Sequence, residues 1–211
     1  MTRFISFLVL VLVALTFGGN SMAIEIPKYE VLVKADDFEV RHYDPYIVAE
    51  TVVDGDFDSA STKGFKRLAG YIFGGNQSKK KISMTAPVGM KEKSSEKIAM
   101  TAPVAQEKRN GKYVVTFSMP SSYTMETLPT PDDENVALRA VPEKTFATVQ
   151  FNGTWSSSRY EDHLSSLRDW IKKQGYESVG EPNFARYDPP WTLWFLRRNE
   201  ILIEIKRPAT L

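Results

Sequence analysis

The chain has 211 residues, with 27 lysine and arginine residues, 26 aspartate and glutamate residues and no cysteine. This near-neutral charge argues against a nucleic-acid partner, because phosphate binding requires a basic surface. The lack of cysteine excludes disulfides, a thiolate nucleophile and attachment of a cofactor through Cys-x-x-Cys-His, so any cofactor is held without a cysteine bond.

The N-terminus has the form of a secretory signal peptide. Arg3 supplies a positive charge, residues 4–17 form an apolar run, and Ser21-Met22-Ala23 places small residues at the cleavage positions. The run is shorter than the about 20 residues of a bilayer span. We expect cleavage after Ala23, no stable membrane span in the mature chain, and a periplasmic or secreted protein. An uncleaved membrane anchor is the alternative.

Strands and a helix are predicted in the first part of the chain. Residues 28–53 alternate apolar and polar side chains in three short runs that are typical of strands. Residues 58–73 place Phe65, Leu68 and Ala69 on one side of a helix. Gly74 and Gly75 are expected to end that helix.

The motif Met-Thr-Ala-Pro-Val occurs twice, at residues 84–88 and 100–104. Alternation predicts a strand around each copy, with the proline at a strand end or edge. Asn110-Gly111 predicts a hairpin turn that joins a strand at 98–106 to one at 112–119. The methionines either fill the core, or Met84 or Met100 lines a cofactor pocket.

The last third of the chain contains a second predicted helix and two strand-like runs. The helix covers about 157–174, and Gly175 is its expected C-cap. The strand-like runs lie within residues 191–207, around a polar turn at 197–200.

The two helices occur in similar sequence contexts. Residues 38–59 align on residues 137–157, which pairs Ala49 with Ala147 and Gly55 with Gly153. We interpret this as a duplication with half-repeats at about 28–120 and 135–207; chance similarity is the alternative. The predicted fold class is α+β: a single domain at 24–211, with a distorted antiparallel β-barrel, two helices and two pseudo-repeated halves.

Several segments resemble the SOUL haem-binding family. They are "FEVRHYDPYIVAETVV", "KISMTAPV" and "ARYDPPWTLWFLRRNEILIEI", and the likeness covers about residues 28–207. The resemblance implies a distorted β-barrel flanked by two helices, an architecture shared with gyrase-inhibitor-like small-molecule-binding domains. It also implies non-covalent, b-type binding of haem or another tetrapyrrole in an apolar groove beside the first helix, by a carrier or buffer and not a catalyst.

The resemblance also suggests which residues contact the ligand. His42 stands where some members have a proposed axial iron ligand, although a partly buried histidine bonded to a neighbour is the alternative. Lys63 corresponds to a basic residue near a propionate, and Phe65 to an apolar residue under the ring. Ala69 stands where some relatives have a larger apolar residue. The expected cofactor-binding residues are His42, Lys63, Phe65, Ala69, Met84 and Tyr187.

Two other functions remain open from the sequence. A hydrolase of the gyrase-inhibitor-like type would use a buried glutamate with a tyrosine, and Glu204 is the glutamate to inspect. The chain has no Gly-x-Ser-x-Gly, His-Glu-x-x-His or P-loop motif, so common hydrolase chemistries are not expected. A protein-interaction module that docks through loop 89–97 is the other alternative. For His163 we favour a packing role in the second helix.

Overall fold

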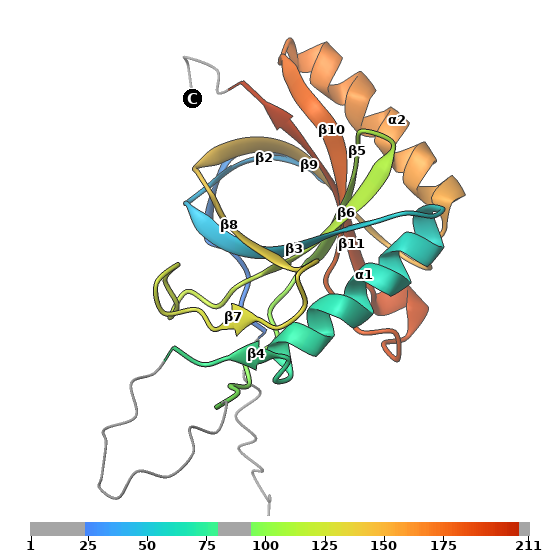
Figure 1. Cartoon of the computed structure of the whole chain (residues 1–211). Coiled ribbons are helices and arrows are strands. Elements are labelled where there is room, and N and C mark those ends of the chain that lie inside the picture. The colour runs from blue at the N-terminus through green and yellow to red at the C-terminus, as the bar shows by residue number, and fades with distance from the viewer. Residues whose placement is uncertain (1–23, 80–93, 207–211) are drawn as a thin grey trace, which may run out of the picture.

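The computed structural model describes residues 24–79 and 94–206 (Figure 1). It contains helices α1 (Phe57–Ile72) and α2 (Ser157–Gln174) and a 3-10 helix η1 (Trp194–Leu196). The strands are β1 (Tyr29–Ala35), β2 (Phe38–Tyr43), β3 (Tyr46–Val53), β4 (Asn76–Gln77), β5 (Val104–Arg109), β6 (Lys112–Ser118), β7 (Thr130–Pro131), β8 (Ala137–Val141), β9 (Lys144–Asn152), β10 (Ser178–Arg186) and β11 (Arg198–Ile205).

Nine strands form one antiparallel sheet in the order β1-β2-β9-β11-β10-β5-β6-β3-β8, and β4 pairs with β7 separately. The sheet curves strongly, and both helices lie on its outer face (Figure 1). The α+β class is confirmed, but the predicted barrel is wrong because the sheet is not closed. Both edges of β2 and of β3 are already occupied, by β1 and β9 and by β6 and β8 respectively. The chain therefore passes from β2 to β3 through Pro45 without pairing these strands, and β1 and β8 are left as the sheet edges.

The strand order reads symmetrically from its centre. β10 and β5 pair in the middle, and each half of the sheet then continues with equivalent partners. β2 lies beside β9 of the other half of the chain, and β8 lies beside β3. Gly55 and Gly153, which precede the two helices, both have a positive φ, of 139° and 130°. This is the pattern expected if the chain were duplicated and each half paired its first strand, β2 or β8, with the other half. The duplication itself stays a prediction.

Both helices have side-chain caps at their N-termini. The Asp56 carboxylate accepts hydrogen bonds from the amides of Asp58 and Ser59, and the Ser156 hydroxyl accepts one from the amide of Arg159. Gly175 ends α2 in the left-handed conformation with φ 72°. The two predicted helices are thus confirmed nearly to the residue. In the described residues no helix is long and apolar enough to cross a membrane.

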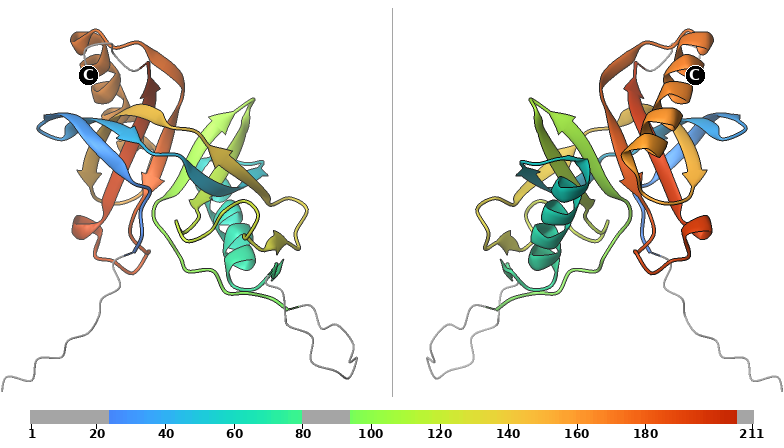
Figure 2. Two further views of the ribbon diagram at one scale, coloured as in Figure 1. Left: turned by 90° about the vertical axis from the view of Figure 1, so that its left-hand side faces the viewer. Right: turned by 90° about the vertical axis from the view of Figure 1, so that its right-hand side faces the viewer.

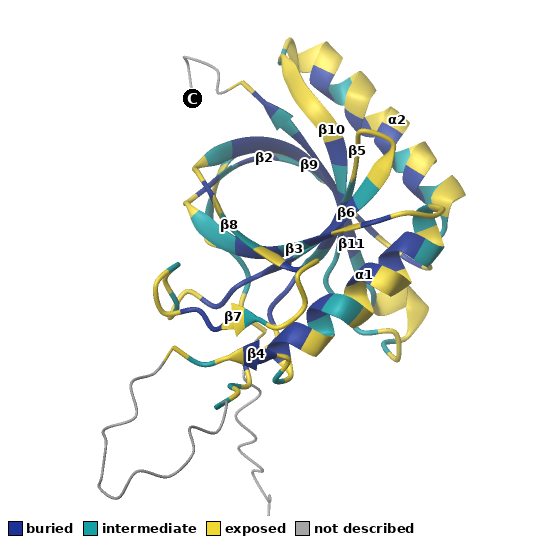
Figure 3. Cartoon of the chain, in the orientation of Figure 1, coloured by how far each residue is buried: buried dark blue, intermediate teal, exposed yellow. Residues whose placement is uncertain are grey.

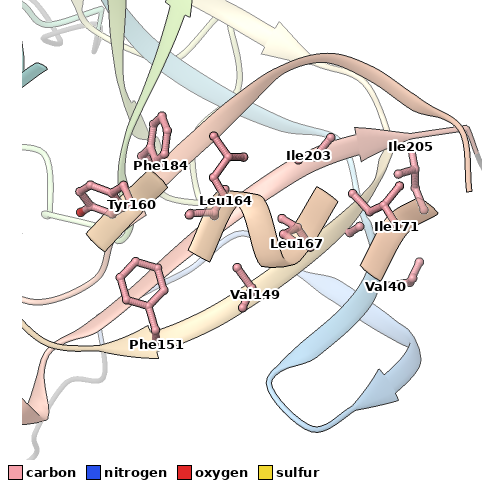
Figure 4. Close-up of a cluster of buried hydrophobic side chains, with 12 residues drawn as sticks. Val40, Val149, Phe151, Tyr160, Leu164, Leu167, Ile171, Phe184, Ile203 and Ile205 are labelled. Atoms are coloured by element: carbon pink, nitrogen blue, oxygen red, sulfur yellow. The ribbon is translucent and has the colours of Figure 1, made fainter. Parts of the chain in front are cut away.

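The outer face of the sheet carries the main apolar core. The stripe of α2 packs on strands β2, β9, β10 and β11 (Figure 4). The buried residues of this core, from the helix and the strands together, are Val40, Ala147, Val149, Phe151, Tyr160, Leu164, Leu167, Ile171, Phe184, Ile201, Ile203 and Ile205. A second cluster forms where α1 packs on β3 and β6. Figure 3 shows the same division, with each helix buried on its sheet side and exposed on the other.

The structure tests three of the predictions about strands and turns, and a fourth falls outside the described residues. Residues 98–103 are not in a strand; β5 begins at Val104, after Pro103, which has no amide hydrogen for a ladder. The Asn110-Gly111 turn is confirmed, with φ 52° and 80°. The C-terminal segment forms one strand, β11, so the expected strand before residue 197 and the turn at 197–200 are wrong. The first Met-Thr-Ala-Pro-Val copy lies outside the described residues.

The contact between α1 and β6 generates a prediction about two glycines of the same helix. A Cβ added at Gly64 would lie 2.4 Å from Val115 Cγ2 and 2.5 Å from Val115 Cβ, whereas a Cβ at Gly70 would meet nothing within 4 Å. We expect Gly64→Ala to lower the free energy of unfolding by about 1–3 kcal/mol through overpacking. Gly70→Ala should raise it by about 0.5–1 kcal/mol, because glycine disfavours the helix. Urea unfolding of both variants tests the packing; equal effects would contradict it.

Candidate functional site

A buried ion pair lies on the inner face of the sheet. Arg41 of β2 donates to Glu200 of β11 through Nη1 at 2.8 Å and Nη2 at 3.0 Å. The side chains are 2% and 0% exposed. β9 lies between the two strands, so the pair connects strands that share no backbone hydrogen bonds. Two charges out of water need full hydrogen bonding to be tolerated.

Further donors complete the coordination of the Glu200 carboxylate. The Tyr187 hydroxyl donates to Oε2 at 2.7 Å, and Arg198 donates to Oε1 through Nε at 3.0 Å and Nη2 at 2.7 Å. Arg41 also donates from Nε to Glu39 at 2.7 Å. Oε2 of Glu200 therefore accepts two hydrogen bonds and Oε1 accepts three, so neither oxygen is left to act on a ligand.

Aromatic rings surround this cluster and affect its protonation. The Arg41 guanidinium lies 4.6 Å from the Tyr29 ring centroid, and the Arg198 guanidinium 4.0 Å from that of Tyr187. Burial, followed by the negative charge of Glu200, raises the pKa of Tyr187 well above its usual value. Burial alone would lower the pKa of Arg41, but its bonds to Glu200 outweigh this and raise it. Tyr187 thus stays a protonated donor and Arg41 stays charged at neutral pH.

The sequence pointed to the wrong glutamate as the buried one. Glu204 is 29% exposed and pairs with Lys144 of β9. Glu200, four residues earlier on the same face of β11, is the buried carboxylate and has the tyrosine partner. Its bonds to Arg41 and Arg198 leave it without the free lone pairs that a general base needs. The geometry therefore gives the hydrolase alternative no support.

The residues expected to bind the cofactor are not brought together. His42 lies on the outer face of β2, where Nδ1 is 3.0 Å from Thr145 Oγ1 and Nε2 is 3.8 Å from Glu143. α1 packs on β3 and β6, and β6 is five inter-strand spacings from β2, roughly 24 Å along the sheet. One macrocycle beside α1 does not reach His42.

Lys63 and Phe65 lie on opposite flanks of α1. Side chains two positions apart on a helix point about 160° away from each other, whereas side chains four positions apart lie on the same side. Lys63 faces the start of the helix, with Nζ 3.4 Å from the Asp54 carbonyl. Phe65 lies on the other side with Ser61 and Ala69, 38% exposed and 5.5 Å from the Phe117 ring. We call the side formed by Ser61, Phe65 and Ala69 the Phe65 flank.

Two other expected ligand contacts are not on this helix flank. Tyr187 points to the inner face, where its hydroxyl binds Glu200, so it does not face α1. Met84 lies outside the described residues. Of the expected residues that the structure describes, only Phe65 and Ala69 are therefore neighbours on one surface. His163 stacks on Phe151 at 3.9 Å, and burial lowers its pKa, consistent with the packing role.

Arg186 faces the Phe65 flank, and the sequence analysis missed it. At the end of β10, its Nη1 donates to Ser61 Oγ at 2.5 Å and its Nε to the Tyr160 hydroxyl at 3.2 Å. Nη2 is buried and has no partner among the described residues. The guanidinium also lies 4.9 Å from the Trp155 ring centroid. Because neighbouring residues of a strand point to opposite faces, the sequence could have placed Arg186 on the face opposite to Tyr187. The contact of Arg186 with α1 depends on tertiary packing and could not be predicted.

Two pockets of about 300 Å³ are present in the described structure. One, of about 310 Å³, lies near Glu25, Tyr46 and Met119. The other, of about 300 Å³, lies between the two helices and is lined by Phe57 and Leu164, among others. Both are at the lower limit for small-molecule sites, so a tetrapyrrole would remain partly outside either. Within residues 24–79 and 94–206 no group of three or more acidic or histidine side chains could hold a metal ion.

The inner-face ion pair generates a stability prediction. Glu200→Gln leaves Arg41 buried without its counter-charge, so we expect the free energy of unfolding to fall by about 3–5 kcal/mol. Glu204→Gln is the matched control on the same strand, and we expect a loss of at most about 1 kcal/mol because that pair is partly solvated. Denaturant unfolding at neutral pH measures both, and a similar loss in the two variants would refute the role assigned to Glu200.

Comparison with solved structures shows relatives of the same fold. The C-terminal domain of EcmrR superposes with a TM-score of 0.59 at 14% identity, covering 85% of this chain and 99% of that one. A protein described as a hydrolase from Listeria innocua gives a TM-score of 0.56 at 9% identity, covering 83% of this chain and 94% of that one. At such identities the likeness concerns the fold alone.

Sequence comparison gives more specific relatives. Heme-binding protein 2 of Mus musculus is 27% identical over 203 residues, covering 90% of this chain and 94% of the relative. Heme-binding protein 1 of Xenopus tropicalis is 27% identical over 170 residues, covering 77% and 84%. The family model described as SOUL heme-binding protein matches residues 24–204. This chain therefore belongs to the SOUL heme-binding protein family.

Proposed function

We propose that this protein binds haem or a related tetrapyrrole non-covalently on the outer face of the sheet, beside the Phe65 flank of α1. Membership of the SOUL family and relatives named as heme-binding proteins support haem binding in general. The observation that carries the position is that the exposed Phe65 ring lies on the same helix flank as Ser61, which binds Arg186, a guanidinium with no acidic partner among the described residues.

These two groups match the two parts of a haem molecule. The macrocycle is flat and apolar and can cover the Phe65 ring, whose 38% exposure leaves it partly in water. The propionates are anionic, and Nη2 of Arg186, which has no partner among the described residues, is the donor left to bind one of them. Arg186 is bonded to Ser61 of the same flank, so its charge and the aromatic ring belong to one surface.

The energetic contributions of the two groups differ. Each 100 Å² of apolar surface removed from water contributes about 2.5 kcal/mol. A single ion pair near the surface contributes up to about 1 kcal/mol. Covering the apolar ring therefore supplies most of the affinity, and Arg186 mainly orients the propionates.

The proposed role is that of a carrier or buffer. A site built from one helix flank and a strand end leaves much of the macrocycle open, which favours exchange of the ligand over its chemistry. We also propose export to the periplasm or cell exterior with cleavage after Ala23, on the strength of the charged, apolar and small-residue order in residues 1–23. In this proposal His42 is not an iron ligand.

Haemin titration of residues 24–211, followed at the Soret band, tests the site. Phe65→Ser should weaken binding about tenfold, equivalent to about 1.4 kcal/mol, because it removes the aromatic contact. Arg186→Gln should weaken it severalfold. Lys63→Gln, on the opposite flank of the same helix, and His42→Ala should leave affinity and band position unchanged.

Other results of the titration would place the ligand elsewhere or refute haem binding. Loss of the Soret shift in His42→Ala alone would move the site to β2 and restore histidine ligation. Loss in Lys63→Gln without loss in Phe65→Ser would place the ligand on the other flank of α1. Absence of saturable binding in the unaltered protein would refute the proposed function. Far-ultraviolet circular dichroism of each variant separates these results from unfolding.

A further inference from the structure

The connection between β10 and β11 exposes a group of large apolar side chains. Trp191 is 82% exposed, Leu193 59%, Trp194 56%, Phe195 49% and Leu196 60%. We call residues 191–196 the apolar turn; it is the exposed, yellow segment at the lower right of Figure 3. Single exposed apolar residues are ordinary, but a contiguous group of this size marks a contact surface.

The apolar turn is a rigid projection and not a loose loop. It contains the 3-10 helix η1, in which Leu196 donates to the Leu193 carbonyl at 2.9 Å. Trp194 and Phe195 pack edge to face, with ring centroids 5.6 Å apart. In the two views of Figure 2 the turn stands out at the lower end of the second half of the sheet, well away from α1. The turn is therefore a different element from the Phe65 flank, although Arg186 contacts both Ser61 of that flank and Trp155 at the base of the turn.

Most carbonyl groups of the turn accept hydrogen bonds from within the protein. Arg197 donates from Nε to the Thr192 carbonyl at 2.8 Å and from Nη2 to the Pro190 carbonyl at 2.5 Å. Asn152 donates to the Phe195 carbonyl at 3.1 Å. The carbonyl groups that accept bonds are those of Pro189, Pro190, Thr192, Leu193, Trp194 and Phe195. The pairing of these carbonyl groups lowers the cost of moving the turn from water into the interfacial region of a bilayer.

Two guanidinium groups lie beside the turn, and the Asp188 carboxylate on the same connection accepts a hydrogen bond from the Arg198 amide. Arg186 and Arg197 each lie 4.9 Å from the Trp155 ring centroid, on the side chain that supports the base of the turn. Among the described residues no carboxylate lies within ion-pair distance of either guanidinium. A cation near a membrane surface gains about 1 kcal/mol from anionic lipid.

We propose that the apolar turn docks this protein on the surface of a bilayer that contains anionic phospholipid. Tryptophan, phenylalanine and leucine on a projection are the side chains that enter the interfacial region of a bilayer. A protein partner would need a groove that matches this projection, whereas a lipid surface accepts it directly. The proposal goes beyond haem binding and does not depend on it.

Vesicle co-sedimentation of residues 24–211, which contain every described helix and strand, tests the proposal. The protein should sediment with vesicles of phosphatidylcholine and phosphatidylglycerol, and less with phosphatidylcholine alone. Tryptophan fluorescence should shift to shorter wavelength and be quenched by bromine-labelled lipid. The double variant Trp191→Ser, Trp194→Ser should reduce the partition coefficient at least about tenfold, since both rings leave the interface.

Phe73→Ser is the matched control, because Phe73 is a 57% exposed aromatic residue at the end of α1. This variant should sediment with vesicles like the unaltered protein. Thermal unfolding should be the same for all three proteins, since the substituted side chains make few contacts. High salt should weaken the preference for anionic vesicles.

Two outcomes would overturn the proposal. One is that the unaltered protein does not sediment with either vesicle. The other is that the double variant sediments as well as the unaltered protein. Haemin titration of the double variant separates this proposal from the ligand site. Loss of haemin affinity together with no vesicle binding by the unaltered protein would assign the turn to the tetrapyrrole instead.

Discussion

The buried pair between Arg41 and Glu200 is the constraint on which the rest of the fold depends. It connects β2, from the first half of the chain, to β11 near its end, across the intervening strand β9. Because each charge is almost completely out of water, it is tolerated only with its partner present. The placement of β2 beside β9 and near β11 is therefore held by side-chain electrostatics as well as by backbone pairing. Tyr187, the residue after β10, and Arg198 of β11 complete the same network.

This network also decides which face of the sheet can serve a ligand. The inner face is occupied by the ion pair and by tyrosine rings, whose polar groups already bind one another. The outer face carries the helices, and each helix leaves a flank toward solvent. α1 divides its expected ligand residues between two flanks: Phe65 shares its flank with Ser61, which Arg186 contacts, while Lys63 faces the Asp54 carbonyl. The turn after β10 is a third surface, supported by Trp155 and the two guanidinium groups on it.

Local sequence rules predicted much of the secondary structure but little of the site. The Asn110-Gly111 hairpin and both helices follow from turn and capping chemistry within a few residues. β10 was not predicted, because Gly180 and Pro182 interrupt its pattern and the strand is stabilised by its neighbours β5 and β11. The exposed segment 191–196 was predicted as a strand. Its apolar composition does not distinguish a buried strand from an exposed turn. Phe65 and Ala69 were placed correctly on one helix side, but Arg186 was missed because it comes from a strand more than a hundred positions later.

The sequence by itself determined the family, the α+β class, the lack of any cysteine bond to a cofactor, and the positions of the two helices. These properties depend on composition, on motifs, or on contacts between residues close in the chain. Only the tertiary structure decided that the sheet stays open, that Glu200 and not Glu204 is the buried carboxylate, and which residues share a surface. Strand order fixes all three, and it is set by pairing between segments far apart in the chain. Alternation within one strand shows that two side chains share a face, but not whether that face meets a helix, a counter-charge or water.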